Sequence, residues 1–154
     1  MFKIALFEPE IPQNTGNIAR LCAGTDTELI LIGKIGFSLS DKYLKRAGLD
    51  YWEHVSINLV ESFEDFEKIY PPEKFFYALI TKFAEKTYKE IPNQKTILIF
   101  GNESSGLPEN IRKKYFDKTY KIPMNKKIRS HNLSNSAAIV LYDLISRNNF
   151  MGLS

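Results

Sequence analysis

The sequence predicts an α/β fold of three layers, built around a mainly parallel sheet. Six short apolar runs recur along the chain, and most of them lack the alternation of apolar and polar residues that marks a half-exposed strand. The segments between these runs carry helix signals, and alternating strands and helices are typical of a sheet covered by helices on both faces. The 154 residues contain no repeat or long linker, so we expect one domain over residues 1–154.

The expected strands are short and rich in β-branched and aromatic residues. They are KIALFE (3–8), ELILIG (28–33), HVSINLV (54–60), FFYALIT (75–81), TILIFG (96–101) and KTYKIP (118–123).

The expected helices lie between and after these strands. They cover residues 15–24, 41–47, 63–70 and 132–148. Ser40 is suited to begin the helix 41–47 and Gly48 to end it, and Ser62 is suited to begin the helix 63–70. A further helix is expected after the fifth strand, with Pro108 in its first turn. The longest helix has one apolar face, formed by Leu133, Ala137, Val140, Leu141, Leu144 and Ile145.

The composition argues against disulfides, zinc and membranes. Cys22 is the only cysteine, and with only His54 and His131 beside it no cysteine/histidine zinc cluster can form. The N-terminal MFKIALFEPE turns acidic too early for a signal peptide, and every apolar run is far shorter than the ~20 residues of a membrane-spanning helix. We therefore expect a cytoplasmic protein without a metal and without a membrane contact.

The charge is unevenly distributed. Residues 1–81 carry 8 Lys and Arg against 12 Asp and Glu, whereas residues 82–129 carry 12 against 5. A basic half of this kind indicates a polyanionic partner, although a solvated basic face without a ligand would give the same counts.

The first candidate motif is NTGNIAR, residues 14–20, between the first expected strand and its helix. Open α/β sheets place ligands at the carboxyl ends of their strands, and free amides at a helix start favour anionic groups. Asn14 or Thr15 is equally suited to cap the helix, with Arg20 in solvent. This segment alone therefore leaves both interpretations open.

The second motif is FGNESSGLP, residues 100–108, after the most apolar strand. Gly101 and Gly106 allow a sharp turn and a close approach of the backbone to a ligand, so we expect a larger residue at position 101 to obstruct a ligand slot in a folded protein. The segment has no Gly-Lys-Ser/Thr ending and no nucleophile elbow, and the chain has no Gly-x-Gly-x-x-Gly fingerprint. These absences exclude a P-loop, a hydrolase elbow and a dinucleotide site of that type.

The third motif, IPMNKKIRSHNLSNS, covers residues 122–136 and opens the longest helix. Its hydroxyls and amides present many hydrogen-bonding groups to one small volume, although an elaborate helix cap would look the same. No carboxylate lies near His131 in sequence to orient its ring, so we expect a surface histidine there and not a catalytic base.

In this order the three segments resemble the signature motifs of the SpoU/TrmH-type RNA ribose methyltransferases of the SPOUT superfamily. GNESSGLP is similar to the second motif, IPMNKKIRSHNLSNSAA to the third and NTGNIARLC to the first. With EPEIPQNTGN and RAGLDYW (46–52), they resemble the small branch that methylates the ribose 2′-hydroxyl of the tRNA wobble nucleotide, position 34, whether cytidine or modified uridine. The resemblance implies S-adenosylmethionine as the donor, no metal, a homodimer, the tRNA anticodon loop as substrate, and a C-terminal trefoil knot, which strand patterns alone would not have suggested.

The resemblance also implies the site residues. The cofactor-binding residues would be Leu79, Gly101, Asn102, Glu103, Gly106, Ile122, Met124, Ser130, Leu133 and Asn135. The RNA-binding candidates are Asn14, Asn17, Lys82, Lys126, Lys127 and Arg129. Close relatives often carry an arginine where Ser105 stands, so a phosphate contact is either missing here or supplied by one of the four basic candidates.

Arg20 matches the family's arginine at the methyl-accepting ribose. A guanidinium with a pKa above about 12 is a poor general base, so we favour stabilisation of the developing alkoxide or a grip on a phosphate, with base action left open. Tyr142 lies off the apolar face of the last helix, and its aromatic ring with a polar tip suits a dimer interface. The alternatives are a non-catalytic RNA-binding module, a ribose methyltransferase for another tRNA or rRNA position, and a small-molecule methyltransferase of similar fold.

Overall fold

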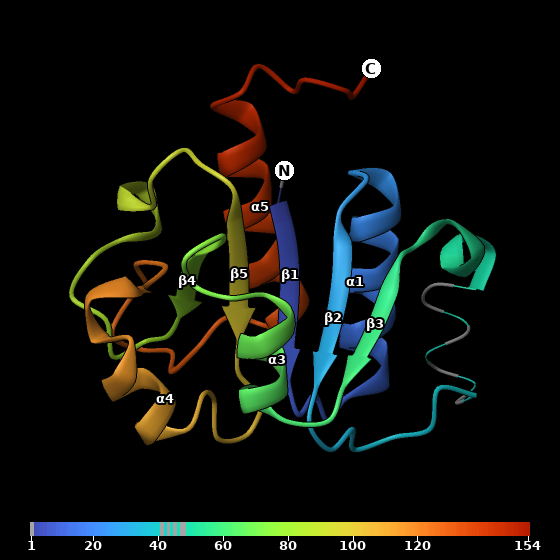
Figure 1. Cartoon of the computed structure of the whole chain (residues 1–154), viewed down its shortest axis with the longest axis horizontal. Helices are drawn as coiled ribbons and strands as arrows, with labels where there is room; N and C mark the ends of the chain where they lie inside the picture. The colour runs from blue at the N-terminus through green and yellow to red at the C-terminus, as the bar shows by residue number, and fades with distance from the viewer. Residues whose placement is uncertain (1, 41, 43, 45, 47–48) are drawn as a thin grey trace.

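The computed structural model describes residues 2–40, 42, 44, 46 and 49–154, and its strands form a six-stranded parallel sheet (Figure 1). The strand order is β3-β2-β1-β5-β4-β6, and every neighbouring pair is parallel. The strands are β1 (Phe2–Phe7), β2 (Glu28–Ile32), β3 (Ile57–Val60), β4 (Phe76–Ile80), β5 (Thr96–Phe100) and β6 (Thr119–Tyr120). Five of the six predicted runs contain one of these strands, and β1 begins at Phe2, one residue before the first run, so the predicted parallel sheet is confirmed.

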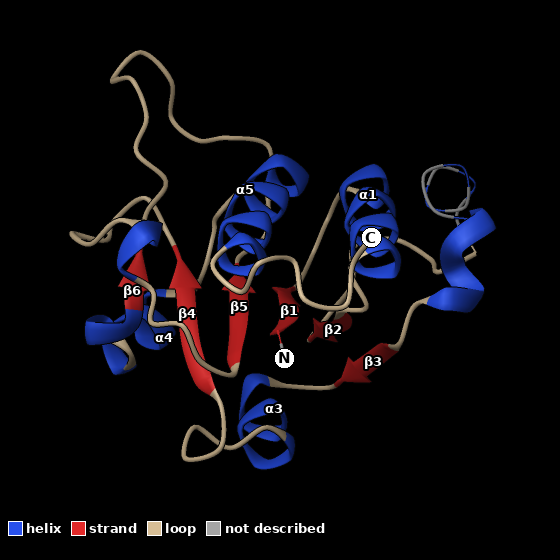
Figure 2. Ribbon diagram, turned by 90° about the horizontal axis from the view of Figure 1, so that it is seen from above, coloured by secondary structure: helices blue, strands red, loops and turns tan. Residues whose placement is uncertain are grey.

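Helices cover both faces of the sheet, as Figure 2 shows. The elements α1 (Pro12–Gly24) and α5 (Leu133–Ser146) lie on one face, and α3 (Phe63–Ile69) and α4 (Glu109–Lys114) pack on the other. Short 3-10 helices are η1 (Leu49–His54), η2 (Tyr88–Glu90) and η3 (Phe116–Lys118). The three-layer architecture is therefore confirmed.

Two apolar cores follow from the alternation of side chains along the strands. In β1, Ile4 and Leu6 point toward α1 and α5, whereas Ala5 points toward α3. The α1/α5 core includes the predicted apolar face of α5, of which five residues are buried and Leu133 is half-buried. Aromatic rings dominate the other core, where Phe66 packs against Tyr70 and Tyr77 with ring centres 5.4 and 5.3 Å apart.

Several boundaries differ from the prediction. Helix α1 begins at Pro12 and not at residue 15, because proline is well suited to the first helical position. Residues 54–56 of the third expected strand precede β3, since His54 ends η1. Pro108 occupies the N-cap position one residue before α4 and does not lie in its first turn. Ser62 caps α3 as predicted by accepting a hydrogen bond from the Asp65 amide.

Most of the second predicted helix, 41–47, lies outside the described residues, since the structure does not describe residues 41, 43, 45, 47 and 48. Within the part of the chain that the structure describes, no helix is long and apolar enough to cross a membrane.

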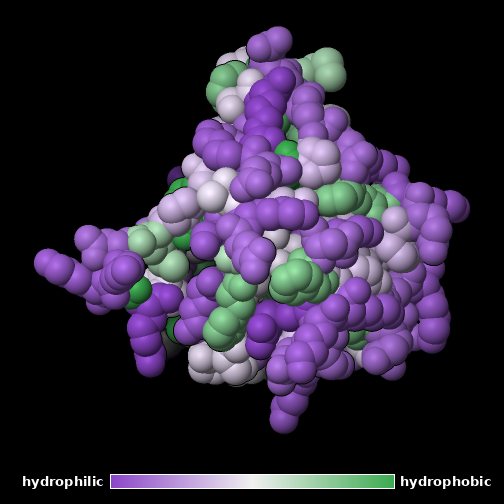
Figure 3. All heavy atoms as spheres, turned by 90° about the vertical axis from the view of Figure 1, so that its left-hand side faces the viewer, coloured by the Kyte–Doolittle hydropathy of each residue, from purple (hydrophilic) through white to green (hydrophobic). Residues whose placement is uncertain are grey.

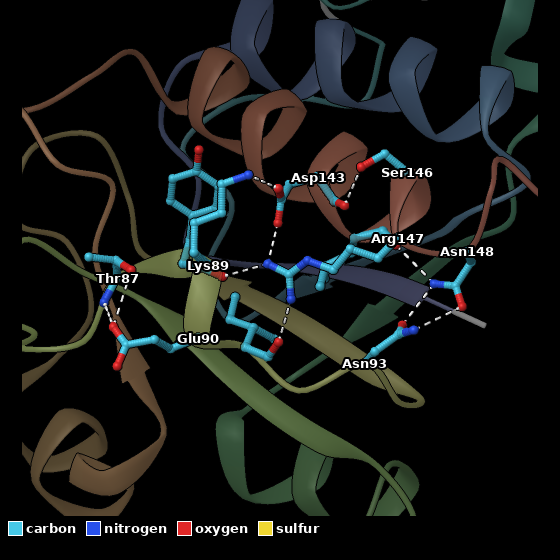
Figure 4. Close-up of polar contacts among 11 residues, drawn as sticks. Thr87, Lys89, Glu90, Asn93, Asp143, Ser146, Arg147 and Asn148 are labelled. Atoms are coloured by element: carbon cyan, nitrogen blue, oxygen red, sulfur yellow. Dashed lines mark hydrogen bonds and ion pairs between the residues drawn. The ribbon is translucent and has the colours of Figure 1, made fainter.

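The C-terminal end of α5 is tied to the connection between β4 and β5, residues 81–95 (Figure 4). Arg147 donates hydrogen bonds to the carbonyl oxygens of Ile91 (2.6 Å) and Tyr88 (3.3 Å) and forms an ion pair with Asp143. Lys89 forms a second ion pair with the same carboxylate. These contacts hold the last helix against a connection that lies more than fifty residues earlier in the sequence.

Candidate functional site

A cavity of about 540 Å³ opens at the carboxyl ends of β4 and β5, beside the first turns of α1 and α5. This is the edge where parallel sheets place their ligands. All three candidate motifs contribute to its wall. The lining residues are Ile11, Asn14, Ile80, Thr81, Lys82, Phe83, Phe100, Gly101, Asn102, Glu103, Ser104, Ser105, Gly106, Leu107, Ile122, Met124, Arg129, Ser130, His131, Asn132, Leu133 and Ser136.

The loop after β5 is folded tightly on itself. The Asn102 side-chain oxygen accepts hydrogen bonds from the amide and the hydroxyl of Ser105, both at 2.8 Å, and the Asn102 carbonyl accepts one from the Gly106 amide at 3.1 Å. Gly106 has φ +70°, a conformation that glycine adopts at little cost. A Cβ at Gly101 would lie 2.0 Å from the Gly106 carbonyl carbon, so the loop closes only over a glycine.

Glu103 joins this loop to the start of α1. Its carboxylate accepts hydrogen bonds from the amides of Glu10 (2.9 Å) and Ile11 (3.1 Å) and from the side-chain amide of Asn14 (3.1 Å). Helix α1 has no side-chain cap of its own, and a negative charge favours the positive end of a helix dipole. The loop after β5 therefore supplies the cap that the α1 sequence lacks.

Asn14 links all three motifs. It donates to Glu103 and accepts a hydrogen bond at 2.9 Å from Asn132, which in turn caps α5 by accepting from the amides of Ser134 and Asn135. Asn14 is 4% exposed, so both ends of its side chain are used inside the protein. These contacts give Asn14 a positioning role, and its RNA-binding role stays a prediction.

The predicted helix-cap roles at the start of α1 are also wrong. Asn14 and Thr15 lie inside the helix, after the N-cap position Ile11. The Thr15 hydroxyl is buried and has no hydrogen-bond partner among the described residues. By contrast, the cap interpretation of the third motif is confirmed at Asn132.

Most of the predicted cofactor residues line the cavity. Those that do are Gly101, Asn102, Glu103, Gly106, Ile122, Met124, Ser130 and Leu133. Leu79 does not, because its side chain is fully buried in the core under α3, and its neighbours Ile80 and Thr81 take the place at the wall. Asn135 is exposed in the first turn of α5 and does not line the cavity either.

The cavity fits a nucleoside-sized cofactor. Its volume lies in the range of ordinary small-molecule sites, about 300–1,000 Å³. Ile80, Ile122 and Leu133 offer an apolar slot, and the turns after β5 and before α5 supply backbone and side-chain hydrogen-bonding groups. The one acidic side chain at the wall, Glu103, is already bound to three donors of the protein.

The predicted RNA-binding cations divide into two groups. Lys82 and Arg129 line the cavity and are exposed. Lys126 and Lys127 are exposed in the long connection between β6 and α5, which stands away from the sheet in Figure 2, and they do not line the cavity. Asn17 is exposed on α1 and lies outside the cavity wall.

Arg20 lies on the exposed side of α1, outside the cavity of its own chain. Its guanidinium carbon lies 4.7 Å from the centre of the Tyr51 ring, and one guanidinium nitrogen donates to the Tyr51 hydroxyl at 3.4 Å. Six residues separate Arg20 from Asn14 at the cavity, roughly 9 Å along a helix. The single chain thus presents an oriented arginine and a cofactor-sized cavity at separate places.

Sequence reasoning missed Tyr51, Phe83 and Arg112 as residues of interest. Phe83 lines the cavity while 60% exposed, and Arg112 lies against its ring. The sequence did contain a signal for Phe83. Lys82 and Phe83 come directly after an expected strand, at the carboxyl edge of the sheet where ligands bind.

The described residues also include a buried thiol and a histidine at the cavity wall. Among the described residues, no three His, Cys, Asp or Glu side chains lie together as a metal site requires. Burial raises the pKa of the Cys22 thiol to about 12, which keeps it protonated and unreactive. His131 lines the cavity, and within the described chain no carboxylate hydrogen-bonds to its ring.

Comparison with known proteins adds a family and relatives. Residues 1–142 match the SpoU rRNA methylase family. The chain is 44% identical over 153 residues to a protein of Methylovorus glucosotrophus (strain SIP3-4) named tRNA (cytidine(34)-2′-O)-methyltransferase, with 99% of each chain covered.

Two solved structures are similar along nearly the whole chain. One, on the 2-OH methylation of C/U34 on tRNA, has a TM-score of 0.91 and 38% identity and covers 97% of both chains. The other, the SpoU methyltransferase AviRb from Streptomyces viridochromogenes in complex with AdoMet, has a TM-score of 0.86 and 21% identity and covers 96% of this chain and 60% of that one. The second likeness shows a common fold.

Proposed function

The chain belongs to the SpoU rRNA methylase family, and from this premise we propose that it transfers a methyl group from S-adenosylmethionine to the ribose 2′-hydroxyl of nucleotide 34 in tRNA. The observation that carries the proposal is the 44% identity, over 99% of both chains, to a tRNA (cytidine(34)-2′-O)-methyltransferase. We infer that residues 1–154 work as one catalytic domain in the cytoplasm, where tRNA is modified.

The cavity after β4 and β5 is the proposed cofactor site. S-adenosylmethionine, when bound, supplies an electrophilic methyl group on a sulfonium. Ile80, Ile122 and Leu133 enclose the apolar part of a ligand there, while Ser130 and the backbone after Gly101 offer hydrogen bonds. The AdoMet complex of AviRb, which shares the fold, supports this choice of cofactor.

Arg20 is the proposed catalytic residue, acting at the acceptor ribose. Its guanidinium stays charged, so it stabilises the developing alkoxide or binds the neighbouring phosphate. Tyr51 positions it through the ring contact at 4.7 Å and the hydroxyl contact at 3.4 Å. Since Arg20 lies outside the cavity of its own chain, we infer a homodimer in which one subunit presents Arg20 to the cofactor site of the other.

The substrate surface is proposed to be the anticodon loop, whose unpaired bases a small protein can read. Lys82 and Arg129 at the cavity, with Lys126 and Lys127 on the connection before α5, are the proposed phosphate contacts, and they offer positive charge where Ser105 carries none. Binding through phosphates releases counterions, so tRNA affinity is expected to fall steeply as salt rises.

The test begins with calorimetry on EDTA-treated protein. S-adenosylhomocysteine should bind without added metal, and the protein should then transfer labelled methyl groups to bulk tRNA, with mapping that places 2′-O-methylation at nucleotide 34. Absence of any cofactor binding would overturn the enzyme assignment in favour of an RNA-binding module. Methylation at another nucleotide would overturn the wobble assignment and leave the chemistry intact.

A further inference from the structure

Phe83 is an exposed aromatic ring at the mouth of the proposed cofactor cavity. It follows β4 in a short turn, in which the Ala84 amide donates to the Thr81 carbonyl at 3.4 Å, and its side chain is 60% exposed. The rings of Phe63, Phe66 and Tyr77 are buried in the core. An exposed ring at a ligand site leaves apolar area in water, and a flat partner would cover it.

Two cations lie against this ring. The Arg112 guanidinium carbon is 4.3 Å from the ring centre, and the Lys82 ammonium nitrogen is 5.3 Å from it. Arg112 also donates from Nε to the Leu107 carbonyl at 3.1 Å, which fixes it to the loop after β5. In the part of the chain that the structure describes, neither cation forms an ion pair, and the exposed Lys82 ammonium can meet an anion.

The surroundings favour nucleic acid over an apolar partner. On the side of the molecule that carries α4 and β6, small apolar areas lie among hydrophilic side chains (Figure 3). Lys121 directly follows β6, whose last residue pairs with Ile80 near the carboxyl end of β4. Single-stranded RNA is bound by just this combination, in which bases stack on aromatic rings and cations follow the phosphates.

We propose that Phe83 is a stacking platform for a base of the substrate RNA, with Arg112 supporting the ring and Lys82 binding a neighbouring phosphate. The inference rests on the proposed function and extends it by naming a residue that holds the nucleotide at the mouth of the cavity. A base that stacks on the ring displaces the exposed Lys82 ammonium, whereas Arg112 stays anchored to the Leu107 carbonyl. In this proposal the exposed ring of Phe83 binds RNA at the mouth of the cavity.

Steady-state kinetics of Phe83→Ala test the platform. The KM for tRNA should rise roughly five- to a hundredfold, because base stacking on an aromatic ring contributes binding of that order, while the affinity for S-adenosylhomocysteine stays unchanged. Phe83→Tyr should keep the KM within about twofold of the wild type, since any aromatic ring can stack. The matched control is Phe116→Ala, because Phe116 is 61% exposed but does not line the cavity, and its KM should not change.

An equal rise in KM for both alanine variants, or a loss of cofactor affinity in Phe83→Ala, would overturn the proposal. A binding measurement that needs no methyl transfer tests the stacking platform independently of the proposed function. In Phe83→Trp, an anticodon stem-loop RNA should quench the added tryptophan fluorescence by stacking, whereas Phe116→Trp with the same background from Trp52 should show no added quenching. Quenching without methylation would refute the enzyme and keep the platform; methylation without quenching would do the reverse.

Discussion

Gly101 holds the loop between β5 and α4 closed, because the backbone of that loop lies where a side chain would be. An added Cβ would lie 2.0 Å from the Gly106 carbonyl carbon and 2.1 Å from the Leu107 nitrogen, and backbone atoms cannot give way as a flexible side chain can. We therefore expect Gly101→Ala to lower the free energy of unfolding by about 2 kcal/mol or more and to abolish cofactor binding. Urea unfolding and calorimetry measure the two effects.

The control for this prediction is Gly24→Ala at the end of α1, where an added Cβ meets nothing within 4 Å. Alanine there should change the free energy of unfolding by no more than about 1 kcal/mol, in the stabilising direction. Wild-type stability and affinity in Gly101→Ala would show that the loop adapts.

For single residues, the sequence indicated which positions belong to the site more accurately than it indicated their contacts. The paired glycines indicated a tight turn after β5, and Gly106 adopts φ +70° there. The expectation that a larger residue at 101 fills a ligand slot in an otherwise folded protein is wrong, because the loop itself occupies the space. Asn14 was predicted to bind RNA, and its side chain also joins Glu103 to Asn132, contacts that the sequence did not predict. Such contacts depend on tertiary packing, which local patterns do not contain.

Among the elements, α5 depends on a polar anchor at its C-terminal end (Figure 4). Arg147 is largely buried and donates to two carbonyl oxygens of the 81–95 connection. Its removal takes away the donor to the Ile91 carbonyl, while the Tyr88 carbonyl still accepts from the Ile91 amide. Arg147→Ala should lower the free energy of unfolding by about 2–3 kcal/mol, as the loss of charged hydrogen bonds does. The midpoint of urea unfolding is the measurement.

Lys89→Ala is the matched control for the anchor. Lys89 pairs with the same Asp143 carboxylate but is mostly exposed, and exposed ion pairs contribute about 0–1 kcal/mol. If both variants lose the same stability, the carboxylate pairing matters and the carbonyl contacts do not.

The elements themselves could be predicted well because their signals are local. Five strands lie within the apolar runs and β1 begins one residue before its run, while Ser62 and Asn132 cap their helices through nearby amides. The start of α1 was placed three residues late although Pro12 is a local signal for it, whereas the carboxylate that binds the amides of Glu10 and Ile11 comes from Glu103, about ninety residues further along the chain. The trefoil knot stays a prediction, since it was implied by the family resemblance and by no pattern of strands.

For the molecule as a whole, the proposed dimer explains why the oriented Arg20 and the cofactor cavity lie apart in one chain. On α5, Ile139 and Tyr142 are 37% and 44% exposed on the side away from the core, and α5 packs beside α1, which carries Arg20. We propose that a second copy covers this apolar surface and presents its own Arg20 to the cavity. Light scattering should therefore give a dimer, and Tyr142→Glu, which places a charge in the interface, should shift the equilibrium toward monomer.

Complementation between two inactive variants tests the shared site. Arg20→Ala keeps its cavity but lacks the arginine, and its turnover should fall about a hundredfold or more with cofactor affinity unchanged. Ile122→Glu keeps Arg20 but places a charge in the apolar slot, and should lose cofactor binding. If Arg20 acts across the dimer, each mixed dimer contains one intact site, and an equal mixture allowed to exchange subunits should recover about a quarter of the wild-type activity. If Arg20 acts within its own chain, neither site of a mixed dimer is complete, and the mixture should stay as inactive as its components.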